Sequence, residues 1–135
     1  MLKGNCIHPE LIHQLALCGH GDQILIADGN YPLAAKSGDA AKIYLGLLPS
    51  VPTVTDVLAA IQSVCNIEAA QVMQPEDGTE PEIFDEFREM LCGMELGKLG
   101  RYAFYNACMK EPLRLAISTG EKRVYANLLI TLGTA

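Results

Sequence analysis

The sequence contains no tryptophan and few charged residues, which make up 19% of its 135 residues. Lysine and arginine together number only 10 against 16 acids, so the net charge is −6. A surface that binds nucleic-acid phosphates must be basic, and this imbalance therefore excludes a nucleic-acid partner. The sequence also lacks any run of about 20 apolar residues, and no signal-peptide pattern follows Met1. We therefore expect a soluble, cytoplasmic protein that does not insert into a membrane.

Sequence patterns that hold metals, nucleotides or activated nucleophiles are missing as well. There is no phosphate-binding loop, dinucleotide fingerprint, nucleophile elbow or metal motif. The cysteines are odd in number and form no C-x-x-C pair, which is typical of reduced, buried thiols. They are Cys6, Cys18, Cys65, Cys92 and Cys108. We expect neither a metal nor an organic cofactor, and only Cys18, near His20, is a candidate for a reactive thiol.

Apolar residues, 50% of the chain, suffice for one hydrophobic core in a single domain, residues 1–135. Helical spacing of apolar residues predicts helices at 9–18, 53–66, 81–91 and 101–110. Short apolar runs predict strands at 23–27, 41–45, 68–73, 113–118 and 125–131, and three glycines predict a flexible segment at 93–100. The alternation predicts an α/β fold with a largely parallel central sheet flanked by helices. The low charge content suggests apolar surface buried between subunits, so we expect a homo-oligomer.

The strand predicted at 23–27 is the element on which the candidate site depends. Its run of apolar residues does not alternate with polar ones, so both faces of the strand should be covered. His20 precedes the strand and Asp28 follows it, and about seven extended residues at roughly 3.3 Å each would separate them by over 20 Å. Either the loop that carries His20 folds back, or a neighbouring subunit completes the site.

Five residues have the chemistry of a polyol-binding or acid–base site. His20 lies between two glycines, which leave its ring accessible for acid–base work, and Asp28 lies where ligands collect in parallel sheets, beyond the carboxyl end of a strand. Tyr125, Asn127 and Arg101 offer hydrogen-bonding groups to hydroxyls. Each also has a structural alternative. The G-H-G-D segment can be a helix cap and turn, Asp28 a turn former, Tyr125 a core residue and Arg101 the partner of an acid.

Four segments together resemble the fucose mutarotase and ribose pyranase (RbsD/FucU) family. They are G-H-G-D, a buried strand ending in D-x-x-x-P, R-Y-A-F-Y, and T-G-E followed by Y-A-N, in register from residue 2 to residue 133. The R-Y-A-F-Y segment is more similar to the fucose branch. The resemblance implies an RbsD-like fold, five-subunit rings stacked into decamers, and sites at subunit interfaces. It implies that His20 transfers protons, and that the sugar contacts are Asp28, Arg101, Tyr125, the main chain of Ala126, and Asn127.

The resemblance therefore implies an isomerase without metal or cofactor that interconverts the α and β anomers of L-fucose or a related monosaccharide. His20 would protonate the ring oxygen of the sugar. Asp28 would orient the imidazole of His20 or accept a hydrogen bond from a sugar hydroxyl. Tyr125 would assist the second proton transfer or only bind the sugar. A D-ribose pyranase would need the same proton transfers. Two further alternatives are a non-catalytic sugar-binding or transport-accessory protein and a purely structural oligomer.

Overall fold

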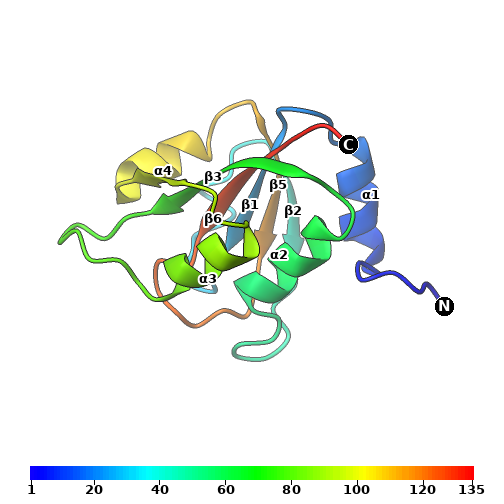
Figure 1. Ribbon diagram of the computed structural model, residues 1–135, viewed down its shortest axis with the longest axis horizontal. Coiled ribbons are helices and arrows are strands. Elements are labelled where there is room, and N and C mark those ends of the chain that lie inside the picture. The colour runs from blue at the N-terminus through cyan, green and yellow to red at the C-terminus, as the bar shows by residue number, and fades with distance from the viewer.

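A computed structural model describes residues 1–135 as six strands and four helices (Figure 1). The strands are β1 (Gln23–Ala27), β2 (Ala41–Tyr44), β3 (Ile67–Met73), β4 (Leu96–Leu99), β5 (Leu113–Ser118) and β6 (Leu128–Leu132). The helices are α1 (Pro9–Leu17), α2 (Val54–Gln62), α3 (Ile83–Met90) and α4 (Arg101–Ala107). None of the four helices combines the length and apolarity needed to cross a bilayer.

The strands form one sheet in the order β2-β5-β1-β6-β3-β4. The pairs β1–β5, β2–β5 and β3–β4 are parallel, and only β6 runs antiparallel to its neighbours β1 and β3. Every strand except β6 therefore points the same way, and the predicted α/β fold with a largely parallel sheet is confirmed.

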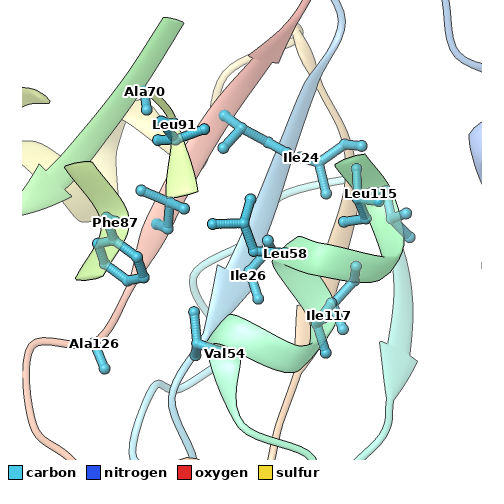
Figure 2. Packing of buried hydrophobic residues seen from close by; sticks show 14 of the residues in the cluster. Ile24, Ile26, Val54, Leu58, Ala70, Phe87, Leu91, Leu115, Ile117 and Ala126 are labelled. Atoms are coloured by element: carbon cyan, nitrogen blue, oxygen red, sulfur yellow. The ribbon is translucent and has the colours of Figure 1, made fainter. Parts of the chain in front are cut away.

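The central strand β1 is covered on both faces, as its uninterrupted apolar run predicted. Ile24 and Ile26 belong to the larger core cluster, to which α1, α2 and α3 contribute. Figure 2 shows both side chains together with Leu58 of α2 and Phe87 of α3. Leu25 and Ala27 face the smaller cluster, which is covered by α4 and the loop of residues 28–40. All four side chains are fully buried. The strand is thus a rigid support that fixes the positions of the residues at both of its ends.

Apart from shifts of a few residues at the ends of helices and strands, the structure differs from the sequence prediction in two places. The segment 93–100, predicted to be flexible, contains β4, in which Leu96 pairs with Ala70 of β3. Pairing along the exposed edge of the sheet outweighs the low strand propensity of glycine there. The last strand begins at Leu128 and not at Tyr125, because Tyr125 has a left-handed backbone with φ of 60°. That conformation interrupts the extended chain and leaves residues 125–127 outside the strand.

The T-G-E segment, residues 119–121, is held against the end of β1 and the start of the loop that follows it. The hydroxyl of Thr119 donates to the Ala27 carbonyl at 2.8 Å, and the Gly29 N–H donates to the Glu121 carbonyl at 2.8 Å. Glu121 is buried, and both of its carboxylate oxygens accept from Arg123 at 3.0 Å. Burial tends to raise the pKa of Glu121, but Arg123 outweighs it and the pKa is lowered. The loops after β1 and before β6 are thereby tied together.

Candidate functional site

The carboxyl end of β1 and the amino end of β6 meet at one edge of the sheet, because β6 runs antiparallel to β1. A cavity of about 200 Å³ lies at this edge. It is lined by Asp28, Asn30, Tyr31, Met73, Arg101, Tyr105, Val124, Tyr125 and Asn127. The structure therefore brings together four of the residues singled out in the sequence, Asp28, Arg101, Tyr125 and Asn127.

The Asp28 carboxyl is buried beneath this cavity, with the residue only 2% exposed. Its Oδ1 accepts from the Asn30 N–H at 2.9 Å, and its own N–H donates to Oδ1 of Asn127 at 2.8 Å. Burial raises the pKa of Asp28, and hydrogen bonds from the main chain of Asn30, Ala126 and Tyr31 and from the Asn127 side chain oppose this only in part. Asp28 thus forms the predicted turn contact and is also a carboxyl with enhanced proton affinity in the cavity.

The Arg101 guanidinium lies beside two neighbouring aromatic rings at the start of α4. Its Cζ is 5.9 Å from the ring centroid of Tyr102 and 5.7 Å from that of Tyr105. Its Nε donates to the Tyr105 hydroxyl at 3.2 Å, and this bond raises the pKa of Arg101. Arg101 takes part in none of the ion pairs of the chain, so the alternative that it is the partner of an acidic side chain is wrong. Most of its N–H donors remain available to a ligand.

The segment before β6 directs two side chains into the cavity and the one between them to the other face of the sheet. Tyr125, with its left-handed backbone, lines the cavity and is half-buried. Asn127 also lines it and is 3% exposed. The Ala126 side chain packs instead in the larger core, on the side of α2 and α3 (Figure 2). Only the main chain of Ala126 faces Asp28, so any contact of Ala126 with a ligand in the cavity would be made through its backbone.

Two aromatic residues of the cavity were not indicated by the sequence. Tyr105 lies one turn after Arg101 on α4, and this i,i+4 spacing is the signal that could have identified it. Tyr31 stacks edge-to-face against Phe104 and Tyr105, with ring centroids 6.2 and 5.3 Å apart. The Tyr31 hydroxyl donates to the Lys36 carbonyl at 2.8 Å, and burial raises its pKa. Tyr31 therefore forms a wall of the cavity, and no sequence pattern marks it.

His20 lies at the opposite edge of the sheet from Asp28. The Gly21 N–H donates to the Leu132 carbonyl at 2.9 Å, which holds the His20 loop beside the carboxyl end of β6. The alternative that this loop folds back onto Asp28 is therefore wrong. The imidazole is exposed and lines a separate open cavity of about 690 Å³, and its Nε2 is 2.9 Å from Oε2 of Glu68. One chain alone does not place His20 at the Asp28 cavity.

The cysteines are all unpaired, but only Cys6 and Cys108 are buried, so the prediction of mostly buried thiols is wrong for the other three. The Cys18 thiol donates to the Gln14 carbonyl at 3.3 Å, within its own helix turn. Burial raises the pKa of Cys18 and nearby Asp22 adds to the increase, so its thiolate is disfavoured. The alternative of a reactive Cys18 is therefore not supported.

The family model described as the RbsD / FucU transport protein family matches residues 1–135. The chain belongs to this family. It is 29% identical to the fucose mutarotase of Mus musculus, over 98% of this chain and 94% of the relative. It is 28% identical to the D-ribose pyranase of Geobacillus kaustophilus, over 100% of this chain and 96% of the relative. Both names denote sugar isomerases, and the two are equally similar to the chain.

Solved structures of the RbsD/FucU family with D-ribose and with L-fucose are likewise similar to the chain to about the same degree. Bacillus subtilis RbsD complexed with D-ribose superposes with a TM-score of 0.86 at 25% identity, over 100% of this chain and 99% of the other. The fucose mutarotase of Streptococcus pneumoniae in complex with L-fucose has a TM-score of 0.82 at 27% identity, over 96% of this chain and 94% of the other. The resemblance to the family is thus confirmed, whereas the sugar is not distinguished.

Proposed function

We propose that the protein is a monosaccharide mutarotase that interconverts the α and β anomers of a free sugar in the cytoplasm. The observation that carries the proposal is the cavity at the carboxyl edge of the sheet, which gathers Asp28, Arg101, Tyr125 and Asn127. A buried carboxyl, a guanidinium, a phenol and an amide are the groups that position a polyol and move its protons. The equal similarity to relatives named as two sugar isomerases supports the same class of reaction.

The proposed reaction opens the cyclic hemiacetal and closes it again on the other face of the carbonyl. A proton is delivered to the ring oxygen, another leaves the anomeric hydroxyl, the ring C–O bond breaks and the aldehyde forms. Rotation about the C1–C2 bond then exposes the opposite face to reclosure. His20 delivers the first proton, Asp28 accepts from a hydroxyl, and Tyr125 assists the second transfer. The steps involve no net change of oxidation state and no group transfer to another molecule, so we expect neither a metal nor an organic cofactor to be required.

A second copy of the chain supplies His20 in this proposal. The imidazole is separated from Asp28 by the length of β1, and its side chain is 57% exposed, so a neighbouring subunit can reach it. The family resemblance implies five-subunit rings stacked into decamers, with the sites at subunit interfaces. Exposed apolar residues are consistent with such contacts, among them Leu17, Leu47, Leu48 and Val64.

We propose L-fucose as the substrate, and D-ribose is the second candidate. The R-Y-A-F-Y segment supports fucose, because it forms α4 and places Arg101 and Tyr105 together at the cavity. The observation that favours D-ribose is the TM-score of 0.86 to the ribose complex. A pyranase would break the same ring bond and reclose it on a different hydroxyl.

Replacement of Arg101 with alanine tests whether this cavity binds the sugar. Hydrogen bonds from a charged donor are stronger than those between neutral groups, so we expect the KM for the sugar to rise about tenfold or more. The value of kcat should change much less, because Arg101 transfers no proton. The measurement is the rate of anomer exchange against sugar concentration. Arg114→Ala, at an exposed position of β5, is the matched control. An unchanged KM in Arg101→Ala would remove the cavity from the proposal.

A further inference from the structure

The imidazole of His20 has one hydrogen-bonding partner, and no sequence motif pointed to it. Nε2 of His20 lies 2.9 Å from Oε2 of Glu68, which is 48 residues away in the chain. Glu68 is the second residue of β3, on the strand that pairs with β6. The pairing of β3 with β6 thus brings the two side chains together, because it places the start of β3 beside the end of β6.

The surrounding backbone holds both partners in place. The His20 loop is fixed to β6 by hydrogen bonds from the Gly21 N–H to the Leu132 carbonyl and from the Leu132 N–H to the Asp22 carbonyl, both 2.9 Å. The Glu68 side chain passes beside Gly133, where an added Cβ would lie 3.3 Å from Glu68 Cβ and 3.5 Å from Oε2. A side chain at position 133 would crowd the path of the carboxylate towards His20.

We propose that Glu68 is a positioning residue that holds His20 in one tautomer and turns its Nδ1 towards the sugar. The inference rests on the proposed function. When one ring nitrogen of a histidine donates to a carboxylate, the proton of the neutral ring stays there and the other nitrogen is left to react. With Nε2 bound to Glu68, the nitrogen that exchanges protons with the substrate is Nδ1.

This arrangement fits both directions of the proposed reaction. In ring opening, the imidazolium transfers the proton on Nδ1 to the ring oxygen, the ring C–O bond breaks, and the anomeric hydroxyl proton passes to an acceptor in the cavity. The imidazole of His20 is then neutral, with its remaining proton on Nε2, facing Glu68. In reclosure, the free Nδ1 lone pair takes back the proton of the attacking hydroxyl. The Glu68 carboxylate stabilises the imidazolium before and after the cycle, as carboxylates do for catalytic histidines.

A purely structural role is the competing explanation, and the exposure of the pair argues against it. The side chains of His20 and Glu68 are 57% and 46% exposed. Ion pairs that are this open to solvent contribute little to the stability of a fold. The Glu68→Gln variant should therefore fold normally, so that a change in catalysis can be separated from a change in stability.

The test compares Glu68→Gln with Glu95→Gln in the assembled protein. Glu95 is an exposed acid just before β4 that takes part in no ion pair. We expect kcat to fall about tenfold or more in Glu68→Gln, with KM unchanged, and neither value to change in Glu95→Gln. Nitrogen-15 NMR of the histidine rings adds a readout independent of activity. The wild type should show His20 protonated at Nε2, and Glu68→Gln should show a mixture of tautomers.

Combination with His20→Ala decides whether Glu68 acts through the imidazole. In the His20→Ala background, Glu68→Gln should cause no further loss of kcat, because the residue that it positions is gone. An equal loss in both backgrounds, a wild-type kcat in Glu68→Gln, or an unchanged tautomer would overturn the inference. If His20→Ala itself keeps full activity, the proposed role of His20 fails, and the NMR spectrum still decides whether Glu68 sets its tautomer.

Discussion

Replacement of His20 with alanine is expected to remove most of the acceleration of anomer exchange while sugar binding remains measurable. A positioned acid–base group contributes about 10²–10⁴-fold to a rate, so a loss of this size is expected in kcat. The Asp28 cavity lies at the other edge of the sheet and should keep its shape. The measurements are the exchange rate at saturating sugar and the affinity by calorimetry. Full activity in this variant would contradict the assignment.

Two controls sharpen the experiment on His20. His13→Ala removes an exposed histidine from α1 and should leave the exchange rate unchanged. Mixed oligomers of His20→Ala and Asp28→Asn subunits should recover part of the activity, because an intact Asp28 on one subunit can meet an intact His20 on the other. Recovery is expected only if different chains supply the two residues. Inactive mixed oligomers, confirmed to contain both chains, would indicate a site within one chain.

Replacement of Asp28 with asparagine is expected to lower kcat by roughly 10²-fold and at the same time to stabilise the fold at neutral pH. Burial raises the pKa of Asp28 in the folded protein, so the folded state binds this proton more tightly than the unfolded chain does. Stability therefore falls as pH rises from the unfolded pKa through the folded pKa, and a cost is present at neutral pH. Asparagine removes the charge and keeps an acceptor for the Asn30 N–H.

Thermal unfolding as a function of pH checks the expectation for Asp28. The Tm of Asp28→Asn should exceed that of the wild type by a few degrees at pH 7, and the difference should shrink below about pH 4, where the unfolded carboxyl is also protonated. Asp39→Asn, at an exposed position in the same loop, is the control for loss of one negative charge. A lower Tm at pH 7, or an unchanged kcat, would show that Asp28 is a structural carboxylate.

The sequence was sufficient for the elements that local patterns determine. The apolar run of β1 predicted a strand covered on both faces, and the position of Asp28 beyond that strand predicted a residue at the carboxyl edge of a parallel sheet. Tyr125 and Asn127 were identified by their chemistry, but the strand was predicted to begin too early. No apolar or polar period reveals that a tyrosine takes a left-handed backbone.

Contacts between distant elements could not be predicted in the same way. β4 was missed because its two middle residues, Gly97 and Lys98, give little strand signal, and the pairing with β3 decides its conformation. Glu68 was missed because only the order of strands in the sheet brings β3 to the end of β6 and so to His20. The distance along β1 correctly indicated that His20 and Asp28 stand apart in one chain.

The measurement that tests the central claim most directly is magnetisation transfer between anomeric protons, recorded with L-fucose and D-ribose side by side. We expect enzyme-dependent transfer between the α and β pyranose signals of L-fucose, proportional to protein concentration and strongly reduced in His20→Ala. Transfer confined to D-ribose, linking pyranose and furanose signals, would identify a pyranase instead. Sugar binding without any enhanced transfer, from folded and assembled protein, would contradict the enzymatic function.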